Sequence, residues 1–83
     1  MELLYFAWVR ERIGTGAETL DIPDYIATVA ALLDWLATRS PGHKAALADR
    51  SAIRVAVDQD FVGDAAPSAS AHEIAIFPPV TGG

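Results

Sequence analysis

The sequence has 83 residues and a net charge of −5, which suits one small acidic domain and leaves no room for a second core. Hydrophobic residues make up 52% of it and charged residues 20%, a balance typical of a folded protein and not of a disordered one. Only six residues are Lys or Arg, so the charge argues against nucleic acid and anionic membranes as partners and favours a basic protein surface.

Cysteine is absent from the sequence, which excludes a disulfide framework and a thiolate metal site. The apolar run near the N-terminus is short and follows Glu2 without a cationic segment, so we expect no signal peptide. No apolar run is long enough to span a bilayer. These features predict a cytoplasmic protein that does not enter a membrane.

An uninterrupted apolar run predicts a first strand over residues 3–9. Alternation divides its side chains between two faces, with Leu3, Tyr5, Ala7 and Val9 on one and Glu2, Leu4, Phe6 and Trp8 on the other. The acidic residue marks the second face as the wetter one, and large apolar groups on a wet face indicate a binding surface. Gly14 and Gly16 then predict a turn, and residues 18–22 predict a second strand that forms a hairpin with the first.

Thr28 is a suitable N-cap for a helix that we expect to run to about Arg39. One face of this helix is apolar at the spacing that packs on a sheet, through Val29, Leu32, Leu33 and Leu36. Ser40, Pro41 and Gly42 predict its end, and residues 43–48 predict a short helical turn with Leu47 buried.

A third strand is expected around residues 53–57, with Ile53, Val55 and Val57 facing inward and Arg54 and Ala56 outward. Residues 58–60 predict a turn, and residues 61–62 a brief fourth strand. The last strand is expected over residues 72–77, with Ile74 and Ile76 inward and Glu73, Ala75 and Phe77 outward.

The first and last strands are apolar enough to be central neighbours, and they should be parallel because the helix lies in the crossover between them. This order of elements predicts an α+β fold, a ubiquitin-like β-grasp in which one main helix packs across a mixed sheet of four or five strands. We expect the domain to cover residues 1–77 and an extended tail to cover residues 78–83.

The residue types in the tail predict an extended and narrow segment. Pro78 and Pro79 lack a backbone N–H, so they end sheet pairing and keep the chain extended. Gly82 and Gly83 lack a Cβ and can pass through a channel too narrow for other residues. Six extended residues reach roughly 19 Å, enough to enter the active site of another protein.

Four segments carry a resemblance to a known family. The run Phe77-Pro78-Pro79-Val80-Thr81-Gly82-Gly83 resembles the end of the small, ubiquitin-like subunit of molybdopterin synthase. Residues 4–11 resemble the first strand of that family, and residues 28–32 and 56–59 fall where its helix begins and its third strand turns. The resemblance spans nearly the whole chain.

The resemblance implies a sulfur carrier. An activating enzyme that uses ATP and Mg would adenylate the carboxylate of Gly83, and sulfur from a donor protein would convert it to a thiocarboxylate. Pro78, Pro79, Val80, Thr81 and Gly82 would guide this end into the large subunit of molybdopterin synthase, where sulfur passes to cyclic pyranopterin monophosphate. The complex would be a heterotetramer. The catalytic lysines of the family lie on the large subunit, and without cysteine the carboxylate is the attachment point that remains.

The partner interface is expected on the outer sheet face. Alternation and the resemblance place Phe6 and Phe77 there, and the resemblance adds Arg10. Phe61 has two readings, as part of the interface or as an aromatic at the edge of the core, and Trp8 shares this ambiguity.

No metal or cofactor site is expected on this chain. His43 and His72 lie in separate elements and are expected on the surface, while Asp58 and Asp60 are better explained as turn formers than as a catalytic pair. The sequence lacks a phosphate-binding glycine loop. Two alternatives stay open, a sulfur carrier for thiamine synthesis or tRNA thiolation, and an interaction domain whose tail is never activated. A standalone enzyme is the least favoured.

Overall fold

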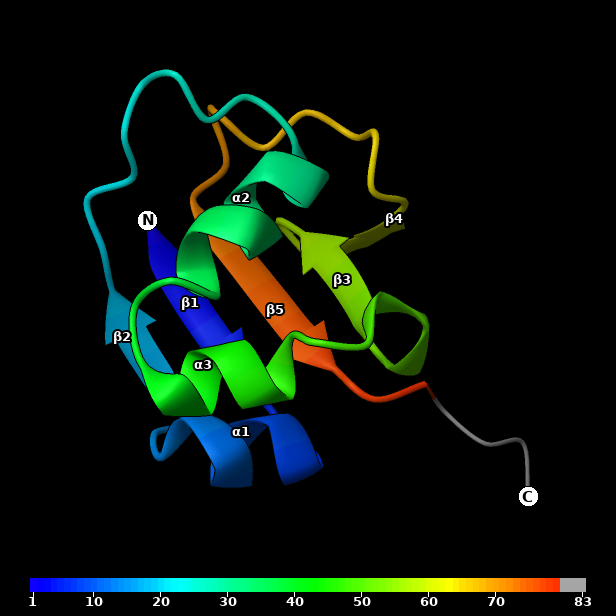
Figure 1. Ribbon diagram of the computed structural model, residues 1–83. Coiled ribbons are helices and arrows are strands. Elements are labelled where there is room, and N and C mark those ends of the chain that lie inside the picture. The colour runs from blue at the N-terminus through cyan, green and yellow to red at the C-terminus, as the bar shows by residue number, and fades with distance from the viewer. Residues whose placement is uncertain (80–83) are drawn as a thin grey trace.

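Parallel pairing of the first and last strands sets the architecture of the computed structural model, which describes residues 1–79 (Figure 1). The sheet is mixed, with the order β2-β1-β5-β3-β4. Its strands are β1 (Glu2–Tyr5), β2 (Ala17–Thr19), β3 (Arg54–Val57), β4 (Asp60–Val62) and β5 (Glu73–Phe77). The helices are α1 (Ala7–Ile13), α2 (Val29–Leu36) and α3 (Pro41–Ala46), with a 3-10 turn η1 (Arg50–Ala52). The expected α+β class is confirmed. So is the prediction that the first and last strands of the chain, β1 and β5, are parallel neighbours in the middle of the sheet.

The core lies between one face of the sheet and the helices. Leu3 of β1 and Ile74 and Ile76 of β5 are completely buried there. The expected helical stripe meets them, because Val29, Leu32, Leu33 and Leu36 of α2 are all buried. Burying an aliphatic side chain of this size stabilises the fold by roughly 1.5–3 kcal/mol, so these two layers account for much of the stability.

The prediction of a strand over residues 3–9 is wrong beyond Tyr5. Phe6 is the last extended residue, and α1 begins at Ala7, whose positive φ of 53° turns the chain away from the strand. Gly14, with φ of 96°, ends the helix by donating its N–H to the Arg10 carbonyl at 2.8 Å. An apolar run with few polar residues cannot distinguish strand from helix, since both periods fit it. The fold therefore has helices beside α2, where one main helix was expected.

Trp8 and Val9 consequently lie on α1 instead of on opposite faces of a strand. Val9 is buried in the core, and Trp8 is partly buried against it. The guanidinium carbon of Arg12 lies 4.5 Å from the centre of the Trp8 ring, one helical turn away. Trp8 is thus an aromatic at the edge of the core.

Several boundaries differ from the predictions. The second strand covers Ala17–Thr19, and Leu20 and Ile22 follow it as partly buried loop residues. Thr28 caps α2 as expected, its hydroxyl accepting the Ala31 N–H at 3.3 Å. The helix ends at Leu36, before the expected Arg39, because the N–H groups of Thr38 and Arg39 bond three residues back and tighten the last turn.

The third helix begins earlier than expected. It runs from Pro41 to Ala46, where a turn over residues 43–48 was predicted, and Ser40 caps it by accepting the His43 N–H at 3.1 Å. Proline at the first helical position needs no N–H partner, so Ser-Pro is a helix start here and not only a helix stop. Leu47 is buried, as predicted.

The turn between β3 and β4 depends on Asp58. Asp58 and Gln59 have φ of 47° and 74°, the left-handed pair of a tight hairpin turn. Asp58 Oδ1 also accepts the N–H groups of His72 and Glu73, both at 2.9 Å. The residue therefore joins this hairpin to the start of β5, which is the role of a turn former.

Gly42 is required by a close approach between helices. A Cβ added at this position would overlap the Arg12 carbonyl oxygen of α1, which is backbone and cannot rotate away. We expect Gly42→Ala to lower the free energy of unfolding by about 2–3 kcal/mol, the usual effect of overpacking, and to lower Tm by roughly 10–20 °C. Urea and thermal unfolding measure both.

Gly63→Ala is the matched control, because a Cβ at Gly63 meets nothing within 4 Å. It should unfold like the natural sequence. Equal stability of the two variants would show that α1 and α3 separate easily and that this approach does not constrain the fold.

None of the helices within residues 1–79 is long and apolar enough to cross a membrane.

Candidate functional site

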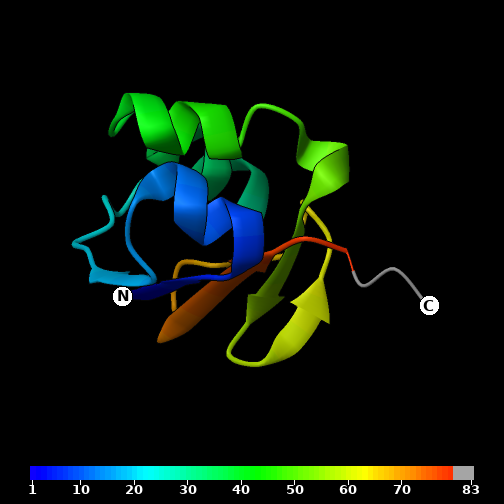
Figure 2. The same ribbon diagram turned by 90° about the horizontal axis from the view of Figure 1, so that it is seen from below.

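The face of the sheet opposite the helices is the first candidate surface. The helices α1, α2 and α3 lie on one side of the sheet (Figure 2), and no helix within residues 1–79 covers the other. Strand register aligns one outward residue from each strand in a row that crosses the sheet: Ala17, Leu4, Ala75, Ala56 and Phe61. The row is apolar throughout, but Ala56 and Ala75 in its middle are buried and Leu4 is partly exposed. Ala17 and Phe61 at its two edges are the exposed members, so the apolar surface open to another protein is largest at Phe61.

Three phenylalanines gather near one end of this face, which we call the tail end because residues 78–83 follow it. Phe61 is 81% exposed, and its ring lies 5.5 Å from that of the half-buried Phe77, centre to centre. Phe6 is 48% exposed and one residue beyond the aligned pair Tyr5 and Ile76, so it lies level with Phe77. An exposure of 81% shows that Phe61 is not an aromatic at the edge of the core, and its part in a partner interface stays a prediction.

Arg10 lies elsewhere. Because the first strand ends early, this residue is on α1, where its side chain extends over Gly16; a Cβ there would come within 3.2 Å of Arg10 Nε. With Glu11, Gly14 and Thr15 it lines a shallow hollow. The structure does not place Arg10 on the open face among the phenylalanines.

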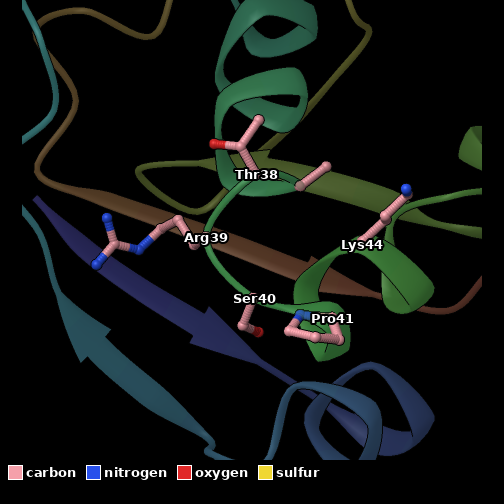
Figure 3. A pocket seen from close by; sticks show the side chains of 6 residues that line it. Thr38, Arg39, Ser40, Pro41 and Lys44 are labelled. Atoms are coloured by element: carbon pink, nitrogen blue, oxygen red, sulfur yellow. The ribbon is translucent and has the colours of Figure 1, made fainter.

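Another hollow lies on the helix side, between α2 and α3, and measures about 730 Å³ (Figure 3). Its charged residues are Arg39 and Lys44, which extend in different directions. The Arg39 guanidinium carbon is 5.1 Å from the centre of the Trp35 ring. The two cations therefore do not converge on one point, and no acidic residue lines this hollow.

A smaller groove of about 290 Å³ opens beside the point where the tail begins. Its walls come from β3, β4, the end of β5 and the first residues after it: Arg54, Val55, Phe61, Val62, Phe77 and Pro79. Strand β5 ends at Phe77, so Pro78 and Pro79 end the sheet pairing as expected. Val80, Thr81, Gly82 and Gly83, which carry most of the predicted chemistry, lie outside the described residues.

Comparison with known proteins identifies the relatives of this chain. The model of the ThiS family matches residues 3–83. The chain belongs to the ThiS family. The molybdopterin synthase sulfur carrier subunit of Escherichia coli is 40% identical over all of this chain and 99% of that protein. The human protein of the same name is also 40% identical, over all of this chain and 93% of its own length. Among solved structures, SAMP1 from Haloferax volcanii has a TM-score of 0.73 at 30% identity, with 100% of this chain and 98% of that chain covered.

This ThiS-family chain also contains a polar network that the sequence did not reveal. His43, expected on the surface, is 7% exposed. Its Nε2 lies 2.7 Å from Glu18 Oε2, the Tyr5 hydroxyl donates to the same oxygen at 2.7 Å, and Ser40 Oγ lies 2.7 Å from His43 Nδ1. The network joins β1, β2 and α3. A strand glutamate and a helix histidine far apart in the sequence give no local signal of this pairing.

Serine, histidine and a carboxylate in contact invite comparison with a nucleophilic triad. Ser40 Oγ, however, already accepts the His43 N–H as the cap of α3, and the imidazole is enclosed. A nucleophile must be free to approach a substrate, so this arrangement is structural. Within residues 1–79 no three His, Asp or Glu side chains come together to hold a metal ion.

The environment of this network changes the acidity of two groups. Burial, with the hydrogen bond to Glu18 and its negative charge, raises the pKa of the Tyr5 hydroxyl, which therefore stays a donor. Burial alone would also raise the pKa of Glu18, but the hydrogen bonds from Tyr5 and His43 and the His43 charge outweigh it and hold that pKa below its ordinary value. The folded state thus favours the ionised carboxylate.

The lowered pKa of Glu18 predicts a loss of stability in acid. The unfolded chain takes up the proton near the ordinary value of 4.5 and the folded chain only at a lower pH, so the free energy of unfolding should fall as the pH drops below 4.5. Asp49, whose pKa is lowered by hydrogen bonds from Ser51, contributes to the same loss of stability in acid. Glu18→Gln should flatten the fall measured by urea unfolding between pH 6 and pH 3, and the exposed Glu11→Gln should not. A curve unchanged by Glu18→Gln would contradict the assignment.

Proposed function

We propose that this chain is the sulfur-carrying small subunit of a molybdopterin synthase, and that it holds sulfur as a thiocarboxylate on Gly83. The observation that carries the proposal is the place where the tail begins: Pro78 and Pro79 follow directly on β5, the central strand, and Pro79 lines a groove together with Phe61 and Phe77. The naming of the relatives as sulfur carrier subunits, at 40% identity over the full chain, supports it.

The chemistry follows from the carboxylate. A carboxylate repels nucleophiles and has no good leaving group, so it must first be converted to an acyl-adenylate, with pyrophosphate released from ATP. The terminal sulfur of a donor persulfide then attacks the acyl carbon and AMP leaves, which gives an acyl disulfide with the donor. A thiol reductant supplies the two electrons that cleave the S–S bond, so that the donor leaves as a thiol and a thiocarboxylate remains on Gly83. ATP and Mg belong to the activating enzyme. The absence of cysteine supports the carboxylate as the attachment point.

The thiocarboxylate would next give up its sulfur to cyclic pyranopterin monophosphate in the active site of the large subunit. Gly82 would supply clearance in the channel, and Pro78, Pro79, Val80 and Thr81 would guide the tail into it. The open face, with Phe6, Phe61 and Phe77 at its tail end, would bind first the activating enzyme and then the large subunit. We place this exchange in the cytoplasm and the final complex in a heterotetramer.

Intact mass spectrometry tests the proposal. The chain is incubated with ATP, Mg, the activating enzyme and a sulfur donor from the same organism, and its mass is measured with and without ATP. The expected result is the exchange of one oxygen for one sulfur, only when ATP is present, on a chain that ends at Gly83. An unchanged mass with an enzyme that is active on its own carrier would refute it.

The receiving protein decides between the synthase and another sulfur pathway. The loaded chain should convert cyclic pyranopterin monophosphate to molybdopterin when the large subunit is added. Loading without this conversion would favour thiamine synthesis or tRNA thiolation. Binding to partners without loading would favour an interaction domain.

A further inference from the structure

The open face carries opposite charges at its two ends. At the end away from the tail, Glu2 of β1 lies next to Glu73 of β5, and the Thr19 hydroxyl donates to Glu2 Oε2 at 3.1 Å. At the tail end, Arg54 of β3 lies opposite Phe77 of β5. The apolar row lies between them. The charge on this face therefore changes from negative at one end to positive at the tail end. The net charge of −5 alone would suggest a uniformly acidic surface.

Hydrogen bonds to two carbonyls hold the Arg54 guanidinium in place but engage only some of its N–H donors. Its Nη1 donates to the carbonyls of Ile53 at 2.8 Å and Ser51 at 3.2 Å. Within residues 1–79 no carboxylate lies within 4.0 Å of its guanidinium, and its Nε and Nη2 make no hydrogen bond to that part of the chain. Because arginine has five N–H donors in a rigid fork, most of its capacity to bind a carboxylate is available.

The same residue forms one wall of the groove at the start of the tail, with Phe61 and Phe77 as apolar walls. A volume of about 290 Å³ lies at the lower limit of small-molecule pockets, so it suits one or two protein side chains better than a ligand. An apolar side chain would cover the two rings, and a carboxylate beside it would reach Arg54.

We infer that this groove receives an apolar side chain of the synthase large subunit and that a carboxylate next to that side chain pairs with Arg54. The inference rests on the proposed function and adds to it the chemistry of the contact. A partner for an acidic chain is expected to be basic overall. An acidic residue at this one point would therefore fix which end of the open face meets it, and so direct the tail toward the active site.

The test measures binding of the purified large subunit from the same organism by titration calorimetry. We expect Arg54→Ala to weaken binding about tenfold and Arg54→Glu roughly a hundredfold, while Arg54→Lys, which keeps the charge but not the fork, loses less than Arg54→Ala. Added salt should weaken binding of the natural sequence more steeply than binding of Arg54→Ala. Lys44→Ala, which removes a cation from the helix side, is the matched control and should bind normally.

Three outcomes would overturn the inference. If Arg54→Ala and Arg54→Glu bind the large subunit with a Kd within twofold of that of the natural sequence, the inference is wrong. The proposed function would not be affected by that result. An effect confined to the activating enzyme, or a self-associated form that Arg54→Glu dissociates in sedimentation, would assign the groove to another occupant. Failure of the natural sequence to bind the large subunit at all would instead refute the proposed function, and this inference with it. Thermal melts of each variant exclude a folding defect, and Arg54 is exposed enough that none is expected.

Discussion

Deletion of Gly83 is expected to abolish sulfur transfer and to leave the fold unchanged. The variant ends on Gly82, which still has a carboxylate, but its reacting carbon lies roughly 3.5 Å farther from the active site of the partner. A displacement of even 1 Å can reduce a reaction about a hundredfold, so we expect a loss of more than about a thousandfold. Formation of the thiocarboxylate by mass spectrometry, and of molybdopterin with the large subunit, are the two measurements.

Gly82→Val separates length from clearance. It keeps the number of residues and the terminal carboxylate but adds a branched side chain where the proposed channel admits none. We expect it to fail as completely as the deletion, whereas the loss from Thr81→Ser should be small. Unfolding curves of the variants should match that of the natural sequence. A shortened chain that still transfers sulfur at a normal rate would refute Gly83 as the reacting residue.

The parts of the fold that follow from local patterns were predictable from the sequence. Val29, Leu32, Leu33 and Leu36 have only one periodicity, and a serine or threonine before such a stripe caps a helix, so α2 was found with its cap. The apolar character of β5 and the crossover before it gave the central, parallel pair. The prolines after Phe77 gave the end of the sheet, because they cannot donate to a neighbouring strand.

The parts that depend on tertiary context were not predictable. The run from Leu3 to Val9 has no polar residue to separate a strand from a helix, and the left-handed turn at Ala7 is unusual for alanine. The buried His43 has a partner from another element, because its ring Nε2 contacts the Glu18 carboxylate. Of the candidate site, alternation placed Phe77 and Phe6 on the outer face of the sheet, while the exposure of Phe61 depends on the tertiary structure.

Phe61→Asp should weaken binding of the large subunit about thirtyfold to a hundredfold, or roughly 2–3 kcal/mol. The ring is 81% exposed, so little is lost from the fold, and its packing on Phe77 makes it the most prominent apolar group beside the tail. Phe77→Asp is a less clean test, because Phe77 is half-buried and its loss would also lower stability. Calorimetric titration with the large subunit and thermal melts measure the two effects separately.

Tyr25→Asp provides the matched control. Tyr25 is 80% exposed, almost as much as Phe61, but lies in the loop between β2 and α2 and not on a strand of the sheet. If exposed aromatics bind partners without regard to position, the two variants should lose affinity alike. If the tail end of the open face is the docking site, only Phe61→Asp should lose it. Equal binding by Phe61→Asp and the natural sequence, with both folded, would mean that the partner reaches the tail without touching this end of the sheet.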